Sequence, residues 1–239
     1  VQAADIAGEN GVPLVIHLSE TQTEVDTIRE RYGVTPVQHL ADLGVLAPNL
    51  LACHCVVVGD ADMALLAEHD VKVAHNPESN MKLASGIAPI AELIGRGVCV
   101  GLGTDGCSSN NNLDLFAEMD MAAKLHKASS LDPTVLDAAT VLRMATIDGA
   151  RALGLDRQIG SLEVGKKADL IIIDTRKPHL TPMYNPVSHL VYAVGGGDVS
   201  TTIVGGRVLM KDRQLMHLDL SKIMADARQI ADQIRAKKA

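Results

Sequence analysis

The stretch Pro13-Leu14-Val15-Ile16-His17 is a short apolar run that ends in a histidine. Three runs of the same character follow it, at residues 50–54 (LLACH), 71–75 (VKVAH) and 98–102 (VCVGL). Longer segments with helical spacing separate or follow them, at about residues 20–46, 60–69, 87–97 and 113–127. Strands that are nearly all apolar are buried on both faces, as parallel strands are beneath helices. The alternation of strands and helices therefore predicts an α/β fold.

The composition is that of a folded globular chain and excludes several kinds of partner. Of the 239 residues, 47% are hydrophobic and 21% are charged, which is ordinary for a packed domain. Acidic residues outnumber basic ones by 29 to 22, so the chain lacks the basic surface that nucleic acid binding requires. No apolar stretch approaches the roughly 20 residues of a membrane span. With no secretion signal, the four cysteines are expected to be reduced packing thiols of a cytoplasmic protein.

Each apolar run ends beside a side chain that can bind a metal or move a proton. The first run ends at His17, with Glu20 three residues later. The next two end at His54 and His75, and the fourth is followed by Asp105. In a β/α barrel the carboxyl ends of the strands carry the functional residues. We therefore expect these side chains to gather at one rim, although any single histidine there could be a packed polar group.

Imidazole and carboxylate groups in this order predict a hydrolytic metal site with an open position for water. His17 is the expected nitrogen ligand, and Asp105 is expected to bind the metal through one oxygen and to accept a proton from water with the other. Glu20 is the expected proton shuttle, and His54 is expected to hydrogen-bond the same water. In isolation, Asp105 within Gly-Thr-Asp-Gly can be read as a turn residue. Zinc is the expected ion, but the same ligands accept iron or manganese.

After about residue 156 the sequence changes from alternating strand and helix segments to short strand-like runs with glycine-rich turns. This change predicts three regions. Residues 1–156 form the strand–helix region, residues 157–220 a β-rich region, and residues 221–239 a C-terminal helix. The β-rich region has expected strands at residues 168–174, 191–194, 201–204 and 207–210. Its glycine clusters, at residues 195–197 and 205–206, are expected to form hairpin turns because neither has the context of a phosphate-binding loop.

Several motifs, taken together, carry a family resemblance. They are HLSE at 17–20, ACHC at 52–55, AHNPESNMKL at 74–83, GTDGCSSNN at 103–111 and GSLEVGKKADL at 160–170. In combination they resemble the metal-dependent amidohydrolase superfamily, and within it they are most similar to the 5-methylthioadenosine/S-adenosylhomocysteine deaminases. The resemblance implies the C-terminal half of a TIM-like (β/α)8 barrel, with strands five to eight in residues 1–156. It also implies part of a small β-sandwich domain in residues 157–220.

The resemblance implies the same site roles as the residues themselves. It assigns the metal to His17 and Asp105, the proton shuttle to Glu20, and a contact with the attacking water to His54. Asn76 and Ser109 lie in matched motifs near the implied pocket and are expected, together with Glu20, to contact the substrate.

One departure from the family is large. The family carries a His-x-His pair at the end of its first barrel strand, and this sequence contains no such pair. The first residues read as a helix just before strand five. We therefore expect an N-terminal portion to be missing, and we expect the chain to bind metal weakly and to be inactive by itself. An open half-barrel with apolar edges is also expected to self-associate as a homo-oligomer.

The expected reaction is zinc-dependent hydrolytic deamination of a small-molecule adenine nucleoside, which gives the inosine analogue and ammonia. 5-Methylthioadenosine and S-adenosylhomocysteine share the reactive ring and differ at the 5′ thioether, so one site can accept both. Two alternatives stay open. One is a related amidohydrolase acting on triazines, guanine or cytosine, and the other is a non-catalytic remnant that serves only as a folding or assembly unit.

Overall fold

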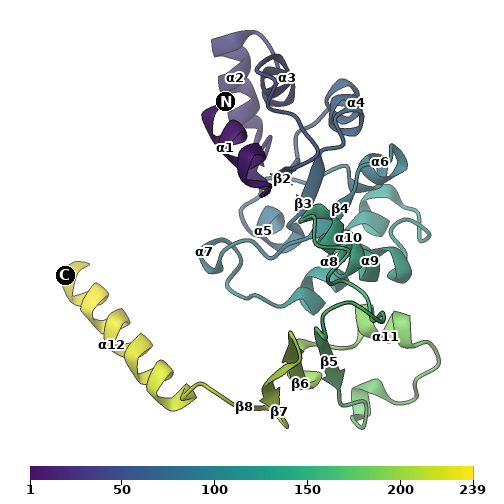
Figure 1. Ribbon diagram of the computed structural model, residues 1–239, viewed down its shortest axis with the longest axis vertical. Coiled ribbons are helices and arrows are strands. Elements are labelled where there is room, and N and C mark those ends of the chain that lie inside the picture. Colours follow the sequence, from purple (N-terminus) through teal and green to yellow (C-terminus); the bar gives the residue numbers. More distant parts are fainter. Residues whose placement is uncertain (239) are drawn as a thin grey trace.

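A computed structural model describes residues 1–238 and contains two four-stranded sheets, the first of which is covered by helices (Figure 1). The strands of the first sheet are all parallel and lie side by side in chain order: β1 (Leu14–Leu18), β2 (Leu50–His54), β3 (Lys72–His75) and β4 (Val100–Leu102). Because they run in one direction, their carboxyl ends share one edge of the sheet. The prediction of an α/β fold is confirmed.

Helices connect the strands and cover the sheet. They are α1 (Gln2–Asn10), α2 (Gln22–Tyr32), α3 (Pro36–Asp42), α4 (Asp60–Glu68), α5 (Pro77–Lys82), α6 (Ile90–Gly95), α7 (Cys107–Asn110), α8 (Leu115–Ser130), α9 (Ala138–Met144) and α10 (Ile147–Ala152). The segment expected to be one helix over residues 20–46 is divided in two. Gly33 ends α2 in a left-handed conformation with a φ of 77°. The Thr35 side chain then caps α3 by accepting from the backbone N–H of Gln38, with Pro36 as the first helical residue.

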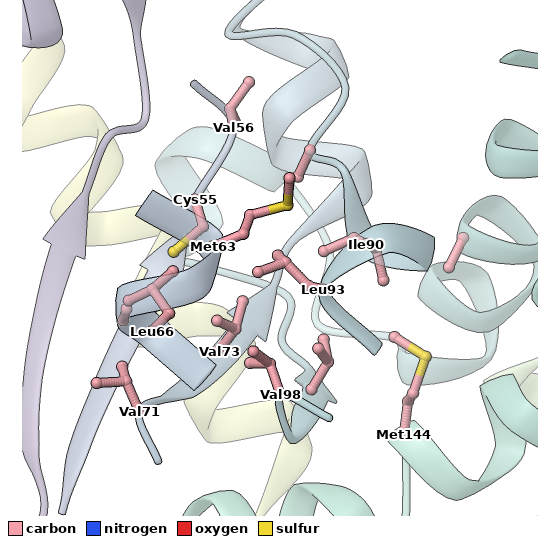
Figure 2. Packing of buried hydrophobic residues seen from close by; sticks show 14 of the residues in the cluster. Cys55, Val56, Met63, Leu66, Val71, Val73, Ile90, Leu93, Val98 and Met144 are labelled. Carbon is pink, nitrogen blue, oxygen red and sulfur yellow. The ribbon is translucent and has the colours of Figure 1, made fainter. Parts of the chain in front are cut away.

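The main hydrophobic core lies between the parallel sheet and its helices (Figure 2). Val73 of β3 is fully buried in it, together with Leu66 of α4 and Leu93 of α6. Each such side chain contributes about 1.5–3 kcal/mol by leaving water. The edge strand β1 differs, because Val15 is 56% exposed there. The expectation that every strand of this sheet is buried on both faces is therefore wrong for β1.

The second sheet is antiparallel and follows the order β5 (Leu170–Ile173), β6 (Val199–Val204), β7 (Arg207–Lys211) and β8 (Gln214–Leu215). The turn between β6 and β7 is Gly205-Gly206, as predicted, and both glycines have positive φ values of 55° and 76°.

One strand predicted for this region is wrong. Residues 191–194 belong to α11 (Pro186–Tyr192) and the turn after it, because Asn185 caps this helix and Pro186 occupies its first position. The glycines at residues 195–197 consequently do not form a hairpin. They lead instead through the short 3-10 helix η2 (Gly196–Asp198) into β6. A second short 3-10 helix, η1 (Pro178–Leu180), follows β5.

The predicted C-terminal helix is α12 (Leu220–Lys238), which extends away from the rest of the molecule (Figure 1). The Asp219 side chain accepts from the backbone N–H of Lys222 at its start. Among residues 1–238, no helix combines the length and the apolar character that crossing a membrane would require.

Candidate metal centre

Three of the predicted side chains converge at the carboxyl edge of the parallel sheet. His17 lies near the end of β1, His54 ends β2, and Asp105 lies three residues beyond β4. Each offers one ligand atom, and these atoms lie within 4.8 Å of one another. The two imidazole rings are stacked, with centroids 5.4 Å apart. Two imidazoles and a carboxylate make a donor set that suits a divalent ion such as zinc, so the residues fit the predicted metal.

Local backbone geometry brings the two histidines together. In the register of the sheet His17 pairs with Cys53, and Leu18 pairs with His54. Since side chains alternate along a strand, regular strands would send His17 and His54 to opposite faces. The left-handed conformation of His54, with a φ of 75°, interrupts this alternation at the strand end. Asp105 also has a positive φ, of 60°. Such conformations are rare outside glycine and concentrate at functional sites.

The orientation of the His54 ring is fixed by Asn80 of α5. The His54 Nδ1 atom lies 2.8 Å from the Asn80 Oδ1 atom, and both residues are buried. An amide oxygen can only accept, so Nδ1 carries the proton and donates it. The Nε2 atom then keeps a free lone pair, which is the form that binds a metal or accepts from water. This Nε2 atom lies 3.9 Å from the Oε2 atom of Glu20.

Asp105 is held as an ionised carboxylate by neutral donors. Its Oδ2 atom accepts from the Ser79 hydroxyl at 2.7 Å, and its Oδ1 atom accepts from the backbone N–H of Gly106 at 2.7 Å. Burial by itself raises the pKa of Asp105. Hydrogen bonds from Ser79, Ser109 and Gly106 outweigh that effect, so the pKa of Asp105 lies below its ordinary value.

Glu20 lies on the loop between β1 and α2, beside this cluster. Its Oε1 atom accepts from the Ser85 hydroxyl at 3.2 Å. The loop is held by Glu24, whose carboxylate accepts from the backbone N–H groups of Ser19 and Glu20, both at 2.8 Å. The Thr21 side chain caps α2 by accepting from the N–H of Glu24. Glu20 is thus positioned at the rim, where the sequence predicts it.

The two other predicted site residues lie around the cluster. Asn76 is buried at the end of β3, and its side-chain oxygen lies against Gly103, where a Cβ atom would collide with it. The Ser109 hydroxyl donates to the carbonyl of Gly106 at 3.1 Å, in the turn that follows Asp105. Their expected contacts with substrate stay predictions.

His75 does not join the cluster, although it ends β3 as His54 ends β2. Its Nε2 atom lies 3.1 Å from the Nε2 atom of His126 on α8, and both side chains are buried. Burial lowers the pKa of each imidazole, so the pair is neutral at physiological pH.

Four supporting residues were not singled out from the sequence. Ser79 and Asn80 lie within a quoted motif, but nothing in it shows which side chains they contact. Glu24 stands three residues after Thr21, a spacing typical of a helix start, and this signal could have found it. Ser85 has no comparable signal.

Comparisons with known proteins agree with this arrangement. The model of the amidohydrolase family matches residues 1–209. A 5-methylthioadenosine/S-adenosylhomocysteine deaminase from Syntrophobacter fumaroxidans is 58% identical over 231 residues, which are 97% of this chain and 53% of that protein. A 5′-deoxyadenosine deaminase from Methanosarcina mazei is 52% identical over 98% of this chain and 54% of its own length. The chain therefore spans about half the length of the curated relatives it matches.

Solved structures show the same relationship. An adenosine deaminase from Xanthomonas campestris with bound zinc superposes with a TM-score of 0.94 at 42% identity, over 97% of this chain and 53% of that one. A zinc complex of atrazine chlorohydrolase from Arthrobacter aurescens superposes with a TM-score of 0.87 at 28% identity, over 95% of this chain and 50% of the other. These matches confirm the expected fold class, the C-terminal half of a TIM-like barrel with part of a smaller β domain.

Proposed function

This chain belongs to the amidohydrolase family, and we propose that it contributes to the hydrolytic deamination of adenine nucleosides at a metal centre formed by His17, His54 and Asp105. The observation that carries the proposal is the convergence of these three ligand atoms within 4.8 Å, with Glu20 beside them. Hydrolytic removal of an amino group at neutral pH requires an activated water and a group that donates protons. A metal held by imidazoles and a carboxylate, with a second carboxyl group beside it, can supply both.

The proposed metal ligands are His17 and Asp105, and the Nε2 atom of His54 is available to the same ion or to a water beside it. Zinc is the proposed ion, since it is bound in the solved adenosine deaminase of Xanthomonas campestris, although iron and manganese accept the same ligands. When bound, the metal supplies Lewis acidity that lets water act as a nucleophile at neutral pH.

The proposed reaction replaces the amino group at C6 of the purine with oxygen. A C6–O bond to water forms and the C6–N bond breaks, which releases ammonia. Asp105 accepts one proton from the water and passes it to the departing amine. Glu20 donates a proton to N1 of the ring and regains one from the new hydroxyl group. His54 accepts a hydrogen bond at Nε2, because Asn80 keeps the ring proton on Nδ1.

The substrate class rests on the relatives. The two deaminases reported above are named for 5-methylthioadenosine, S-adenosylhomocysteine and 5′-deoxyadenosine, which share the adenine ring. The identity of 58% with one of them, against 28% with the triazine-acting enzyme, supports deamination over triazine hydrolysis. Asn76, Ser109 and Glu20 are the proposed substrate contacts in this chain.

The proposal can be tested in a hybrid protein. In it, this chain replaces the matching half of the Syntrophobacter fumaroxidans relative, and adenine nucleosides, triazines, guanine and cytosine are offered as substrates. We expect conversion of the adenine nucleosides, and a loss of about 100-fold or more in kcat for Glu20→Gln and Asp105→Asn. A folded, zinc-loaded hybrid that leaves adenine nucleosides unchanged would contradict the proposal.

The isolated 239-residue chain provides a second test. That it is inactive alone stays a prediction, which the same assay without the relative's half checks. Zinc stoichiometry tests the remaining alternative, because about one tightly held zinc per chain would argue against a non-catalytic remnant. Size-exclusion chromatography checks the predicted homo-oligomer.

A further inference from the structure

A buried carboxylate on α8 lies outside the metal cluster and ties together two segments that carry it. Glu118 is fully buried. Its Oε1 atom accepts from the Asn110 side-chain amide at 2.5 Å, and its Oε2 atom accepts from the backbone N–H of Glu78 at 3.2 Å. Asn110 belongs to α7 and Glu78 to the first turn of α5. Each oxygen of Glu118 therefore holds a different segment against α8.

The α5 connection leads to two of the proposed ligands. The residues directly after Glu78 are Ser79, which donates to Asp105, and Asn80, which fixes the ring of His54. The hydrogen bond between Glu118 and the backbone N–H of Glu78 therefore holds the first turn of α5 against α8. Ser79 and Asn80 make their contacts with Asp105 and His54 from this part of α5.

The α7 connection leads to Asp105 from the other side. The amide group of Asn110 donates to Glu118 and also to the carbonyl of Thr104 at 2.8 Å. Thr104 directly precedes Asp105, whose backbone has the uncommon positive φ. Glu118 is therefore linked, through Asn110, to the turn that carries Asp105.

The surroundings of Glu118 show that packing alone does not explain it. The neighbouring buried residues on the same helix are mostly small or apolar: Met119, Ala122 and Ala123. Burial raises the pKa of Glu118 to about 7, with the nearby Glu78 carboxylate adding to the effect, while the hydrogen bonds from Glu78 and Asn110 oppose it. A buried carboxyl group is costly unless both oxygens are used, as they are here.

We propose that Glu118 is a positioning residue, which sets Asp105 and His54 in the geometry that binds the metal. The inference deepens the proposed function and rests on it, because it concerns the same metal centre. Glu118 touches neither ligand, and it acts through Ser79, Asn80 and Asn110.

The test compares zinc affinity in the full 239-residue chain by competition with a chelator. Glu118→Gln keeps the shape of the side chain but leaves one of the two donors without an acceptor. We expect a 10–100-fold weaker zinc affinity, the range typical for residues that orient metal ligands. Asn110→Ala, which breaks only the α7 connection, should also weaken it. Unchanged zinc affinity in both variants would overturn the proposal.

Two control variants separate positioning from general stability. Glu68→Gln changes an exposed carboxylate on α4 and should leave zinc affinity unchanged. Leu66→Ala removes a buried apolar side chain of α4, a helix that supplies none of the proposed ligands, and should lower stability without a matching loss of zinc affinity. If Leu66→Ala weakens zinc binding as much as Glu118→Gln does, the effect is general and the proposal fails.

Hydrogen exchange in the metal-free chain gives a readout that does not depend on metal binding. The backbone N–H of Gly106 donates to Asp105, so it should exchange at least several-fold faster in Glu118→Gln than in the unmodified chain. If the unmodified chain binds too little zinc to measure, this exchange rate alone decides the role of Glu118, while the hybrid protein tests the proposed function separately. An unchanged rate at Gly106 would contradict that role.

Discussion

Two carboxylates in different regions have pKa values below the ordinary range for different reasons: Asp105 at the edge of the parallel sheet and Asp198 directly before β6 of the antiparallel sheet. Asp198 is buried and accepts from the backbone N–H of Gly195, from Lys177 Nζ at 2.7 Å and from His179 Nε2 at 3.1 Å. The Gly195 bond is the largest of the effects that hold the pKa of Asp198 well below its ordinary value. Its charge is therefore fully matched within its own region.

The carboxylate of Asp105 accepts from neutral donors, the Ser79 hydroxyl and the backbone N–H of Gly106. Within residues 1–238 no lysine or arginine forms an ion pair with it. Its ligand atom faces the imidazoles of His17 and His54 instead. We infer that Asp198, with its matched cations, stabilises the fold, whereas Asp105, which faces two imidazoles and has no such cation, serves the proposed metal site.

The largest expected effect comes from removing the charge at each position in turn. Asp105→Asn should lower zinc affinity by more than about 100-fold, because it removes a direct ligand and exceeds the loss from supporting residues. Asp198→Asn should leave zinc affinity unchanged. Competition with a chelator measures the zinc affinity of both variants. Equal losses of zinc affinity in the two variants would contradict the different roles assigned to Asp105 and Asp198.

A smaller effect is expected at Asn80, which supports the site without being a ligand. Asn80→Ala leaves the Nδ1–H group of His54 unpaired and lets the ring proton move to Nε2, so zinc affinity should fall by about 10–100-fold. Asn49→Ala, which removes an exposed amide that donates to Val12, is the matched control and should have no effect. An Asn80→Ala chain that binds zinc as tightly as the unmodified chain would show that the ring needs no such support.

Asp198 should affect the stability of the fold rather than metal binding. Asp198→Asn should lower the free energy of unfolding by about 1–3 kcal/mol at pH 7, because the backbone N–H of Gly195 and the side chains of Lys177 and His179 lose a charged acceptor. The pKa of Asp198 is depressed in the folded state, so its stabilisation is present above its unfolded-state pKa of about 4 and is lost as the pH falls further. Urea unfolding at pH 7 and pH 3 should show the difference between the two chains shrinking at pH 3. A constant difference would contradict the assignment.

A last expected effect is the pH dependence of stability that Glu118 brings. Its pKa is raised from 4.5 to about 7 in the folded state, so the folded chain binds an extra proton between these values. The stabilising contribution is full below about pH 4.5 and is lost as the pH rises through 7. The stability of the unmodified chain relative to Glu118→Gln should therefore decline between pH 5 and pH 7.5. If the difference in stability between the two chains does not change over this pH range, the raised pKa of Glu118 is contradicted.

The main features of the site could be predicted from the sequence because parallel strands bring their ends to one edge. That rule places the runs that end at His17 and His54, and the Asp105 turn after the fourth run, at one edge. It does not predict the left-handed conformation of His54 that brings the two imidazoles together. The structure places one ligand atom of each of the three residues within 4.8 Å of the others, and their roles stay predictions.

The supporting contacts could not be predicted, because they depend on how separate helices pack. Asn80 meets His54 across 26 residues of sequence, and Glu118 meets the backbone of Glu78 across 40. Nothing in the local pattern of α8 shows which segment its buried carboxylate holds.

The wrong strand at residues 191–194 has a local cause. Its β-branched and aromatic residues favour a strand, but the cap at Asn185 and the proline after it start a helix that includes Val191 and Tyr192. A prediction that weighed the Asn-Pro start more heavily than the apolar run would have been correct.

Anomalous scattering at the zinc absorption edge, from crystals of the chain grown with zinc, tests the metal centre most directly. The result we predict is one zinc ion bonded at about 2.0–2.2 Å to an imidazole nitrogen of His17 and a carboxylate oxygen of Asp105, with His54 beside it. Zinc bound at other residues, or no zinc at this edge of the sheet, would contradict the account.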